Sequence, residues 1–132
     1  MRMRVMPKPQ VLVAGALEDN GRYLFVKRVV GNLRVETIEL PYALISQGSN
    51  PVPALADVFL TQLGIDAQVH EVMHETRHNS GSRRSKLWIP ALIFKITAKN
   101  ASAKPVHGLG YVWLSLDDAR KRRLARNAEW LR

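Results

Sequence analysis

Residues 70–78 of the sequence read HEVMHETRH, and the first five letters fit H-E-x-x-H, a signature of zinc proteases. In such enzymes the two histidines lie one helical turn apart and bind one zinc ion, while the glutamate acts as general base. A third histidine, His78, follows four residues after His74. Whether these side chains can share a metal depends on the secondary structure that carries them.

The hydrophobic pattern around the histidines predicts a strand. Between residues 65 and 73 the apolar side chains fall mainly on odd positions and the polar ones on even positions, which is a period of two. Four residues of strand span about 13 Å, whereas two imidazoles on one zinc, at about 2.1 Å each, lie only a few ångströms apart. We therefore expect His70, His74 and His78 on one side of a bulged strand, some of them lining a pocket, and no protease centre.

Turn and breaker residues divide the rest of the chain into strands around one central helix. The pattern predicts an apolar hairpin at 11–17 and 22–28, a strand at 33–40, a loop at 41–53, a helix at 54–63, long strands at 65–78 and 87–97, a turn at 79–82 and a short strand at 111–114. Pro90 indicates a bulge or an edge position. Residues 1–132 are expected to form a single domain, with 1–10 as an N-terminal extension and 115–132 as a basic helical segment that begins with a capping box.

Length and composition exclude several classes of protein. With 132 residues, 46% of them hydrophobic, the chain is long enough for one packed core. The absence of cysteine excludes disulfides, thiolate metal sites and a cysteine nucleophile. No stretch has the roughly 18–20 apolar residues that a membrane span needs, and the first ten residues lack the apolar run of a secretory signal. We expect a cytoplasmic protein without a membrane partner.

Positive charge is concentrated in the second half of the chain. The net charge is +9, and residues 67–132 carry 13 Lys+Arg against 5 Asp+Glu, whereas residues 1–66 carry 7 against 6. One side of the molecule should therefore attract phosphates, nucleic acid or other anions, without specifying which.

Short segments spread over most of the chain resemble one family. They are Ile38-Glu39-Leu40-Pro41, Ala54-Leu55, Leu63-Gly64-Ile65 and Trp113-Leu114-Ser115-Leu116-Asp117-Asp118. From Val11 to about Arg123 the sequence resembles a Nudix domain, the fold of the MutT-type pyrophosphohydrolases. The resemblance implies an α+β protein, an α/β/α sandwich with a mixed sheet, and an activity on nucleoside diphosphate-linked compounds.

The catalytic motif of that family is degenerate in this sequence. The family pattern is G-x5-E-x7-R-E-U-x-E-E-x-G-U, where U is a bulky aliphatic residue. With no gap between Leu40 and Ile65, only Gly64 and Ile65 match outright, and the other positions are occupied by Ala43, Ser49, Asp57, Val58, Thr61 and Gln62. Mg²⁺ is usually held by carboxylates and other oxygen ligands. The resemblance therefore implies that most of the metal-binding glutamates are missing, so no metal or other cofactor is expected to be required.

Other acids leave a second interpretation open. Glu36 and Glu39 lie in the strand before the degenerate motif, and they could act together with Asp57 as a relocated set of metal ligands. In that case the chain would be a divergent active hydrolase that uses Mg²⁺ or Mn²⁺. Otherwise these carboxylates are solvated charges on the surface.

Basic residues supply candidates for phosphate binding. Arginine side chains make bidentate contacts with phosphate, and a Gly- and Ser-containing hairpin tip carries several of them. The candidates at and beside this tip are Arg77, His78, Arg83, Arg84 and Lys86, with Arg28 and Arg34 on earlier strands. The alternative is that the tip is an ordinary solvated turn.

A second basic run lies near the C-terminus, from Arg120 to Arg126. Helix-dipole complementation and solubility explain most of it, although a basic patch also supplies affinity for nucleic acid. The nearby aromatic residues Tyr111, Trp113 and Trp130 are expected in the core or at its rim, which leaves few rings for base stacking.

The sequence as a whole predicts a weakly active or inactive binder of phosphorylated small molecules. A divergent active Nudix hydrolase and a basic nucleic-acid-binding module are the alternatives. A homodimer is compatible with the sequence.

Overall fold

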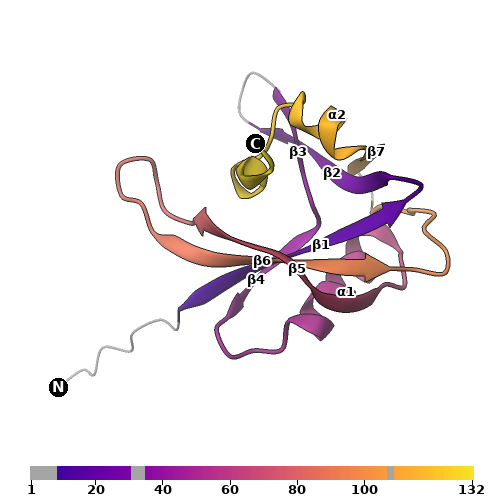
Figure 1. The fold of residues 1–132 in the computed structure, drawn as a ribbon, viewed down its shortest axis with the longest axis horizontal. Coiled ribbons are helices and arrows are strands. Elements are labelled where there is room, and N and C mark those ends of the chain that lie inside the picture. The colour runs from indigo at the N-terminus through magenta and orange to yellow at the C-terminus, as the bar shows by residue number, and fades with distance from the viewer. Residues whose placement is uncertain (1–8, 31–34, 107–108) are drawn as a thin grey trace.

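The computed structural model describes residues 9–30, 35–106 and 109–132 (Figure 1). Its elements in chain order are β1 (Gln10–Asp19), β2 (Arg22–Val30), β3 (Val35–Glu39), β4 (Tyr42–Ser46), α1 (Pro51–Leu63), β5 (Gln68–Asn79), β6 (Trp88–Thr97), β7 (Gly110–Leu114), α2 (Leu116–Arg120) and the 3₁₀ helix η1 (Arg126–Leu131). No helix among these described residues has the length and hydropathy that crossing a bilayer requires.

The strands form one mixed sheet in the order β3-β2-β1-β6-β5, and β4 and β7 pair with β1 and β2 respectively. β1 and β6 run parallel, whereas the other pairs are antiparallel. The β1–β2 hairpin turns at Asn20 and Gly21, whose φ angles are +54° and +78°. Two consecutive positive φ angles give a turn that matches the twist of the flanking strands, so the predicted hairpin is confirmed.

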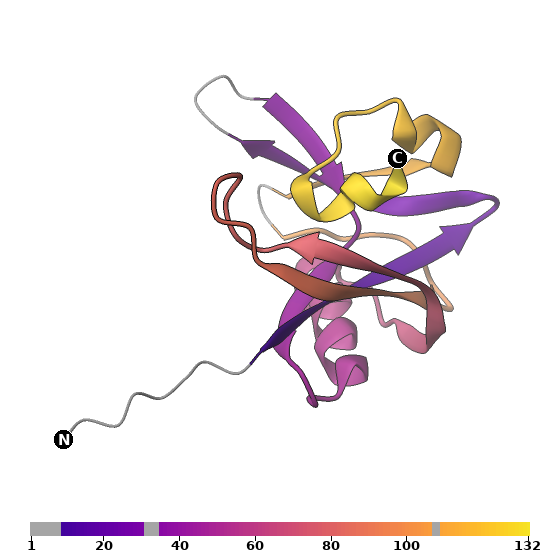
Figure 2. The ribbon, with the colours of Figure 1, turned by 60° about the vertical axis from the view of Figure 1, so that its left-hand side comes forward.

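Both faces of the sheet are covered, which explains why β1 is apolar from Val11 to Leu17. Its even-numbered residues Leu12, Ala14 and Ala16 pack in the core cluster that includes α2 and η1. Its odd-numbered residues Val11 and Val13 pack in the cluster that includes α1. Figure 2 shows α1 and η1 on opposite sides of the sheet. The expected α/β/α sandwich with a mixed sheet is confirmed.

Gly15 lies where α1 packs against β1. A Cβ atom placed on Gly15 would lie 2.5 Å from Cε2 of Phe59 and 2.8 Å from Cγ1 of Ile96. Phe59 is fully buried on α1, so its ring has no exposed side toward which it could move. The glycine in the apolar run therefore allows the helix to pack directly on the central strand.

α1 begins three residues before the predicted start. The side chain of Asn50 caps the helix by accepting a hydrogen bond from the N–H of Val52 at 3.0 Å, and Pro51 occupies the first turn, where its missing N–H costs nothing. The predicted end is confirmed, because Gly64 adopts a left-handed conformation with φ of 66°.

The prediction of a loop over 41–53 was wrong. Residues Tyr42–Ser46 form β4, which pairs with Gln10–Ala14 of β1. The prolines and glycine of this stretch obscured a five-residue strand that follows Pro41 directly. Pro41 also contributes to the sheet, since its carbonyl accepts a hydrogen bond from the N–H of Gly15 at 2.9 Å.

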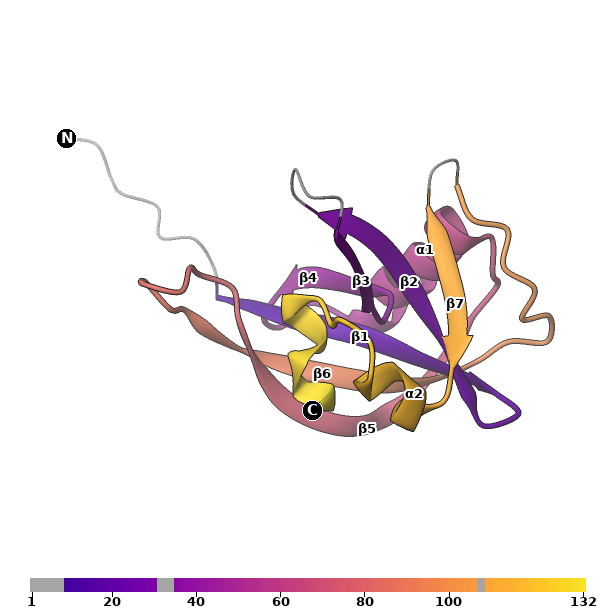
Figure 3. The same cartoon turned by 90° about the horizontal axis from the view of Figure 1, so that it is seen from above.

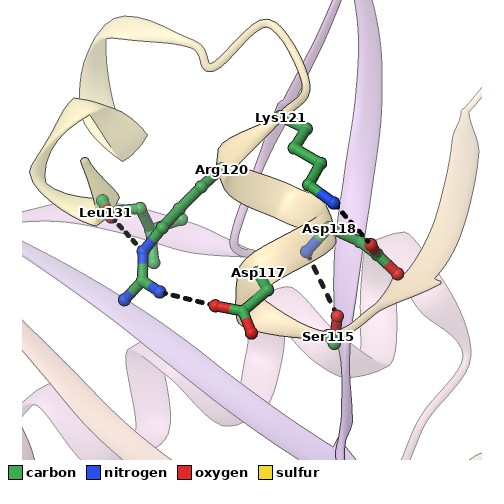
Figure 4. Close-up of polar contacts among 6 residues, drawn as sticks. All are labelled: Ser115, Asp117, Asp118, Arg120, Lys121 and Leu131. Atoms are coloured by element: carbon green, nitrogen blue, oxygen red, sulfur yellow. Dashed lines mark hydrogen bonds and ion pairs between the residues drawn. The ribbon is translucent and has the colours of Figure 1, made fainter.

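The predicted C-terminal helical segment is interrupted, since α2 (Leu116–Arg120) and the 3₁₀ helix η1 (Arg126–Leu131) are separated by residues 121–125. The capping box is present, with Ser115 Oγ accepting from the N–H of Asp118 at 3.1 Å, but α2 ends at Arg120. Arg120 Nε then donates to the carbonyl of Leu131 at 2.8 Å, while its Nη1 lies 3.1 Å from Asp117 (Figure 4). These contacts fold the chain back on itself, so the basic run does not continue as one helix.

β5 is a long strand at the edge of the sheet. Its pairing with β6 shifts register between Val69 and Val72 and again between Val72 and His74, so the bulge predicted near residues 72–73 is confirmed. β6 lies between β1 and β5, so it is not an edge strand as a whole. Pro90 nevertheless lies at a local edge, because the ladder with β1 begins one residue later, at Ala91.

Candidate anion-binding site

A cavity of about 760 Å³ opens between β3, β4, the β5–β6 hairpin and the chain after α2. Its volume falls in the range of small-molecule sites. The wall that the chain after α2 contributes belongs to residues 123–131, here called the C-terminal segment. Figure 3 shows this segment lying across the β5–β6 hairpin on the side away from α1. This space is called the main cavity below.

β3 lines the cavity with alternate residues, as a strand must when one of its faces is exposed to a ligand space. Val35, Thr37 and Glu39 all contribute. Thr37 and Glu39 are buried, at 7% and 4% exposure. Arg28 on β2 pairs with Glu39 through its Nε, which supplies the partner that a buried carboxylate needs. Arg28, predicted as a phosphate ligand, is thus engaged with an acid.

The C-terminal segment is attached to both neighbouring walls. The N–H of Ile38 donates to the carbonyl of Arg123 at 3.0 Å, and the N–H of Ala125 donates to the carbonyl of Ile38 at 3.0 Å. Arg126 Nη2 donates to the carbonyls of Asn79, at 3.0 Å, and Gly81 at the hairpin tip. Arg123 and Arg126 therefore line the cavity from a fixed backbone.

The predicted cations at the hairpin are distributed over several surfaces. Arg83 and His78 line the main cavity, whereas Arg77 and Lys86 line a smaller adjoining groove and Arg84 lines neither. The expected turn at 79–82 is held by Asn79 Oδ1, which accepts from the N–H groups of Gly81 and Leu87, both at 3.0 Å. The remaining candidate, Arg34, lies outside the described residues.

Sequence reasoning missed Arg123 and Arg126 as cavity residues. Both belong to the basic run that the sequence assigns to helix-dipole complementation. Their positions beyond the end of α2 place them against β3 and the hairpin instead. The Ser115 cap marks where α2 begins. If its early end at Arg120 were also known, Arg123 and Arg126 could be placed beyond the helix, but no local pattern in the sequence shows where so short a helix ends.

His78 lies at the junction of the main cavity and the adjoining groove. Burial lowers the pKa of its imidazole from the ordinary value of 6.5, and the positive charge of Arg126 lowers this pKa further, whereas Glu129 acts in the opposite direction. The neutral imidazole is therefore the favoured form at pH 7, so His78 offers one donor and one acceptor to a ligand rather than a charge.

This lowered pKa predicts a pH dependence of stability. Between the folded-state pKa and about 6.5 the native protein binds fewer protons at His78 than the unfolded chain. The stability that neutral His78 contributes to the folded protein is fully present above about pH 6.5, and it is lost as the pH falls through the lowered folded-state pKa. Thermal unfolding of His78→Gln between pH 5 and pH 7.5 should show a weaker loss of stability on acidification than wild type. An unchanged slope would contradict the assignment.

The three histidines of the opening motif lie on β5, and no helix carries them. The ring of His70 lies 2.6 Å from Thr97 Oγ1, the ring of His74 stacks on Trp130 with centroids 5.1 Å apart, and His78 lines the cavity. Across residues 9–30, 35–106 and 109–132 no three His, Asp or Glu side chains are grouped so that they could hold a metal. The predicted strand is confirmed, and the zinc-protease geometry does not occur.

The positions equivalent to the Nudix motif form no carboxylate cluster. Of those on α1, Val58 is buried in the apolar core and Asp57 and Thr61 are exposed, with Thr61 Oγ1 donating to the backbone carbonyl of Asp57 at 2.7 Å. Gln62 is partly buried, Ala43 packs beside the α1 cluster from β4, and Ser49 is exposed in the turn before α1. One carboxylate with neutral neighbours does not fit a hard divalent cation, which favours several oxygen ligands and usually negative charge.

The candidates for a relocated site lie in three different environments. Glu36 is exposed and lies 3.9 Å from Arg122, Glu39 is buried and paired with Arg28, and Asp57 is on the exposed face of α1. Only Glu39 lines the main cavity. The described structure therefore does not bring the three acids together as ligands of one ion.

Comparison with solved structures identifies the fold. The E. coli ORF135 protein superposes with a TM-score of 0.68 at 18% identity, covering 94% of this chain and 86% of that chain. A NUDIX hydrolase from Nitrosomonas europaea gives 0.62 at 19% identity, with 87% and 78% covered. The NUDIX domain of Shewanella oneidensis NrtR, solved with ADP ribose, gives 0.62 at 14% identity, with 96% and 85% covered.

No protein-family model matches the chain, and no curated protein matches it by sequence. The likeness to the solved structures is therefore one of fold. The chain has the fold of the Nudix and MutT hydrolases, as the short sequence segments implied.

Proposed function

We propose that this Nudix-fold protein binds a phosphate-bearing small molecule in the main cavity and hydrolyses it weakly or not at all. The observation that carries the proposal is the composition of the cavity wall. Arg83 and Arg123 face the cavity without an acidic partner among the described ion pairs, the buried Glu39 is already neutralised by Arg28, and Glu129 is the other carboxylate in the lining. A cavity with unpaired guanidinium groups favours an anion of matching geometry.

The weak or absent hydrolysis follows from the residues of α1. Pyrophosphate hydrolysis assisted by metal needs a carboxylate set that holds the ion against the phosphates. Here Asp57 is exposed, and none of Asp57, Val58, Thr61 and Gln62 lines the main cavity. Binding and the missing metal ligands are thus separate features of the chain, and each can be tested alone.

ADP-ribose is the probe of choice, because the NrtR domain of similar fold was solved with it. We expect titration calorimetry to detect its binding, and Arg83→Ala or Arg123→Ala to weaken it by about 10- to 100-fold, the loss of one charge-assisted hydrogen bond. Arg84→Ala is the matched control, since it removes the same charge from the next residue, outside the cavity. Equal losses in Arg84→Ala and Arg83→Ala would show that general charge, not the cavity, binds the ligand.

Hydrolysis is measured separately by following AMP release from ADP-ribose with Mg²⁺ or Mn²⁺. We expect no metal-dependent release above the uncatalysed rate. Release that falls in Asp57→Asn or Glu39→Gln would instead establish the alternative, a divergent active hydrolase with relocated acids. A protein that neither binds nor hydrolyses ADP-ribose, ADP or pyrophosphate would overturn the proposal.

A further inference from the structure

A second concave surface adjoins the main cavity. It is a groove of about 460 Å³ along the β5–β6 hairpin, and it shares six lining residues with the main cavity. The shared residues are His78, Asn79, Arg83, Arg126, Asn127 and Glu129. This surface is called the tryptophan groove below, because Trp88 and Trp130 both line it.

The two indoles are positioned by stacking partners. Trp88 is the first residue of β6 and is 51% exposed, and the guanidinium carbon of Arg77 lies 5.2 Å from its ring centroid. Trp130 on η1 stacks on His74 with an interplanar angle of 30°. A large aromatic side chain left half in water on a charged surface is a ready surface for a planar ligand.

The charges of the groove favour an anionic partner. Arg77, Arg83, Lys86 and Arg126 line it, against one carboxylate, that of Glu129. Among the described residues, none of these four cations takes part in an ion pair with an acid. Arg84 is exposed at the same hairpin tip, so positive charge extends beyond the groove.

We propose that the tryptophan groove binds single-stranded nucleic acid, with a base stacked on Trp88 and the backbone phosphates on the surrounding cations. Stacking on aromatic side chains within a positive groove is the way in which proteins bind single strands without strong sequence preference. The groove would do so whether or not the main cavity takes a small molecule. The sequence gives no hint of this arrangement, because Trp88 and Trp130 are 42 positions apart.

A lipid surface is the competing partner, since Leu87 is 61% exposed beside Trp88. The concave shape of the groove favours a single strand of nucleic acid over a lipid surface. Trp130, His78 and Asn127 are recessed, partly buried residues of a concave surface, which a flat bilayer would not reach. A flexible chain of bases and phosphates can enter such a groove.

The test compares two ligands of equal charge. Fluorescence anisotropy is measured with a labelled 12-nucleotide oligouridine and with an abasic 12-mer that has the same number of phosphates. Wild type should bind the oligouridine about tenfold or more tightly than the abasic strand, as expected for one stacked base. Trp88→Ala should abolish this preference, Trp88→Phe should retain part of it, and Leu87→Ala should leave it unchanged.

Salt dependence tests the phosphate contacts. Lys86→Ala should reduce the slope of log K against log salt by about 1, as the loss of one phosphate contact does. Lys99→Ala removes the same charge from an exposed position outside the groove and should leave the slope unchanged. Equal effects of the two substitutions would overturn the assignment of Lys86 to the bound strand.

Three other results would also overturn the proposal. They are equal binding of the two 12-mers by wild type, an unchanged preference in a folded Trp88→Ala protein, and tighter binding to phosphatidylserine vesicles than to the oligouridine. Near-ultraviolet circular dichroism establishes that each variant is folded. Because Trp88 does not line the main cavity, ADP-ribose binding should be unaffected by Trp88→Ala, which keeps failure of this proposal distinct from failure of the proposed function.

Discussion

The Arg28→Met variant is expected to lose about 2–4 kcal/mol of unfolding free energy, because it leaves Glu39 as a buried carboxylate without its partner. Arg28 is 41% exposed in its side chain, so water recovers part of the cost that a fully enclosed pair would show. Urea denaturation measures the change, and an unaltered m value would show that native stability, not the compactness of the unfolded chain, is affected.

Two further variants distinguish the effect of the Arg28–Glu39 interaction on stability from the effect of losing a charged side chain in general. The double variant Arg28→Met/Glu39→Leu should recover most of the lost stability, since a buried ion pair can often be replaced by apolar side chains at little cost. Arg122→Met is the matched control. Its partner Glu36 lies 3.9 Å away, with both side chains nearly half exposed, so a change of no more than about 1 kcal/mol is expected. Additive losses in the double variant would contradict the coupling of Arg28 and Glu39.

A comparable loss, about 3–5 kcal/mol, is expected for Phe59→Ala. The ring is fully buried and fills the space between α1 and the central strand at Gly15. Removal of the ring should also change the stability cost of placing a methyl group at position 15. Gly15→Ala alone is expected to cost about 1–3 kcal/mol, because its new methyl group meets the ring.

The interaction of the two positions is measured by a double-mutant cycle. In the Phe59→Ala background the Gly15→Ala substitution should cost less than it does in wild type, with a coupling of about 0.5–3 kcal/mol. Thermal or urea unfolding of the four proteins gives this value. A cost for Gly15→Ala that is the same in both backgrounds would mean that the contact with Ile96, rather than Phe59, limits this position.

The sequence predicted the fold well wherever hydrophobic period and turn chemistry agree. The β1–β2 hairpin, the end of α1 at Gly64 and the long strand that carries His74 all rest on such agreement. β4 was missed because Pro41 and the glycine-containing turn after it outweigh a five-residue strand, which is stabilised by pairing with β1 and not by local propensity.

The candidate site was less predictable, because its walls come from distant parts of the chain. The pattern identified Glu39, His78 and Arg83 one at a time, and the structure brings these three to one cavity. Arg123 and Arg126 could not be located from the sequence. Their placement depends on the early end of α2 and on backbone hydrogen bonds to β3, neither of which leaves a local signal.

The attachment of the C-terminal segment to Ile38 and to the carbonyls of the hairpin tip has a consequence for the newly made chain. During synthesis the sheet, α1 and the hairpin leave the ribosome before Arg123–Glu129 do, so the strands that form three walls of the main cavity can assemble first. The fourth wall is added when residues 123–129 have emerged and pair with β3 and the hairpin. The same segment completes the apolar cluster on this face of the sheet, since Leu124, Ala128 and Leu131 belong to it, so a nascent chain would close its ligand site and this part of its core together.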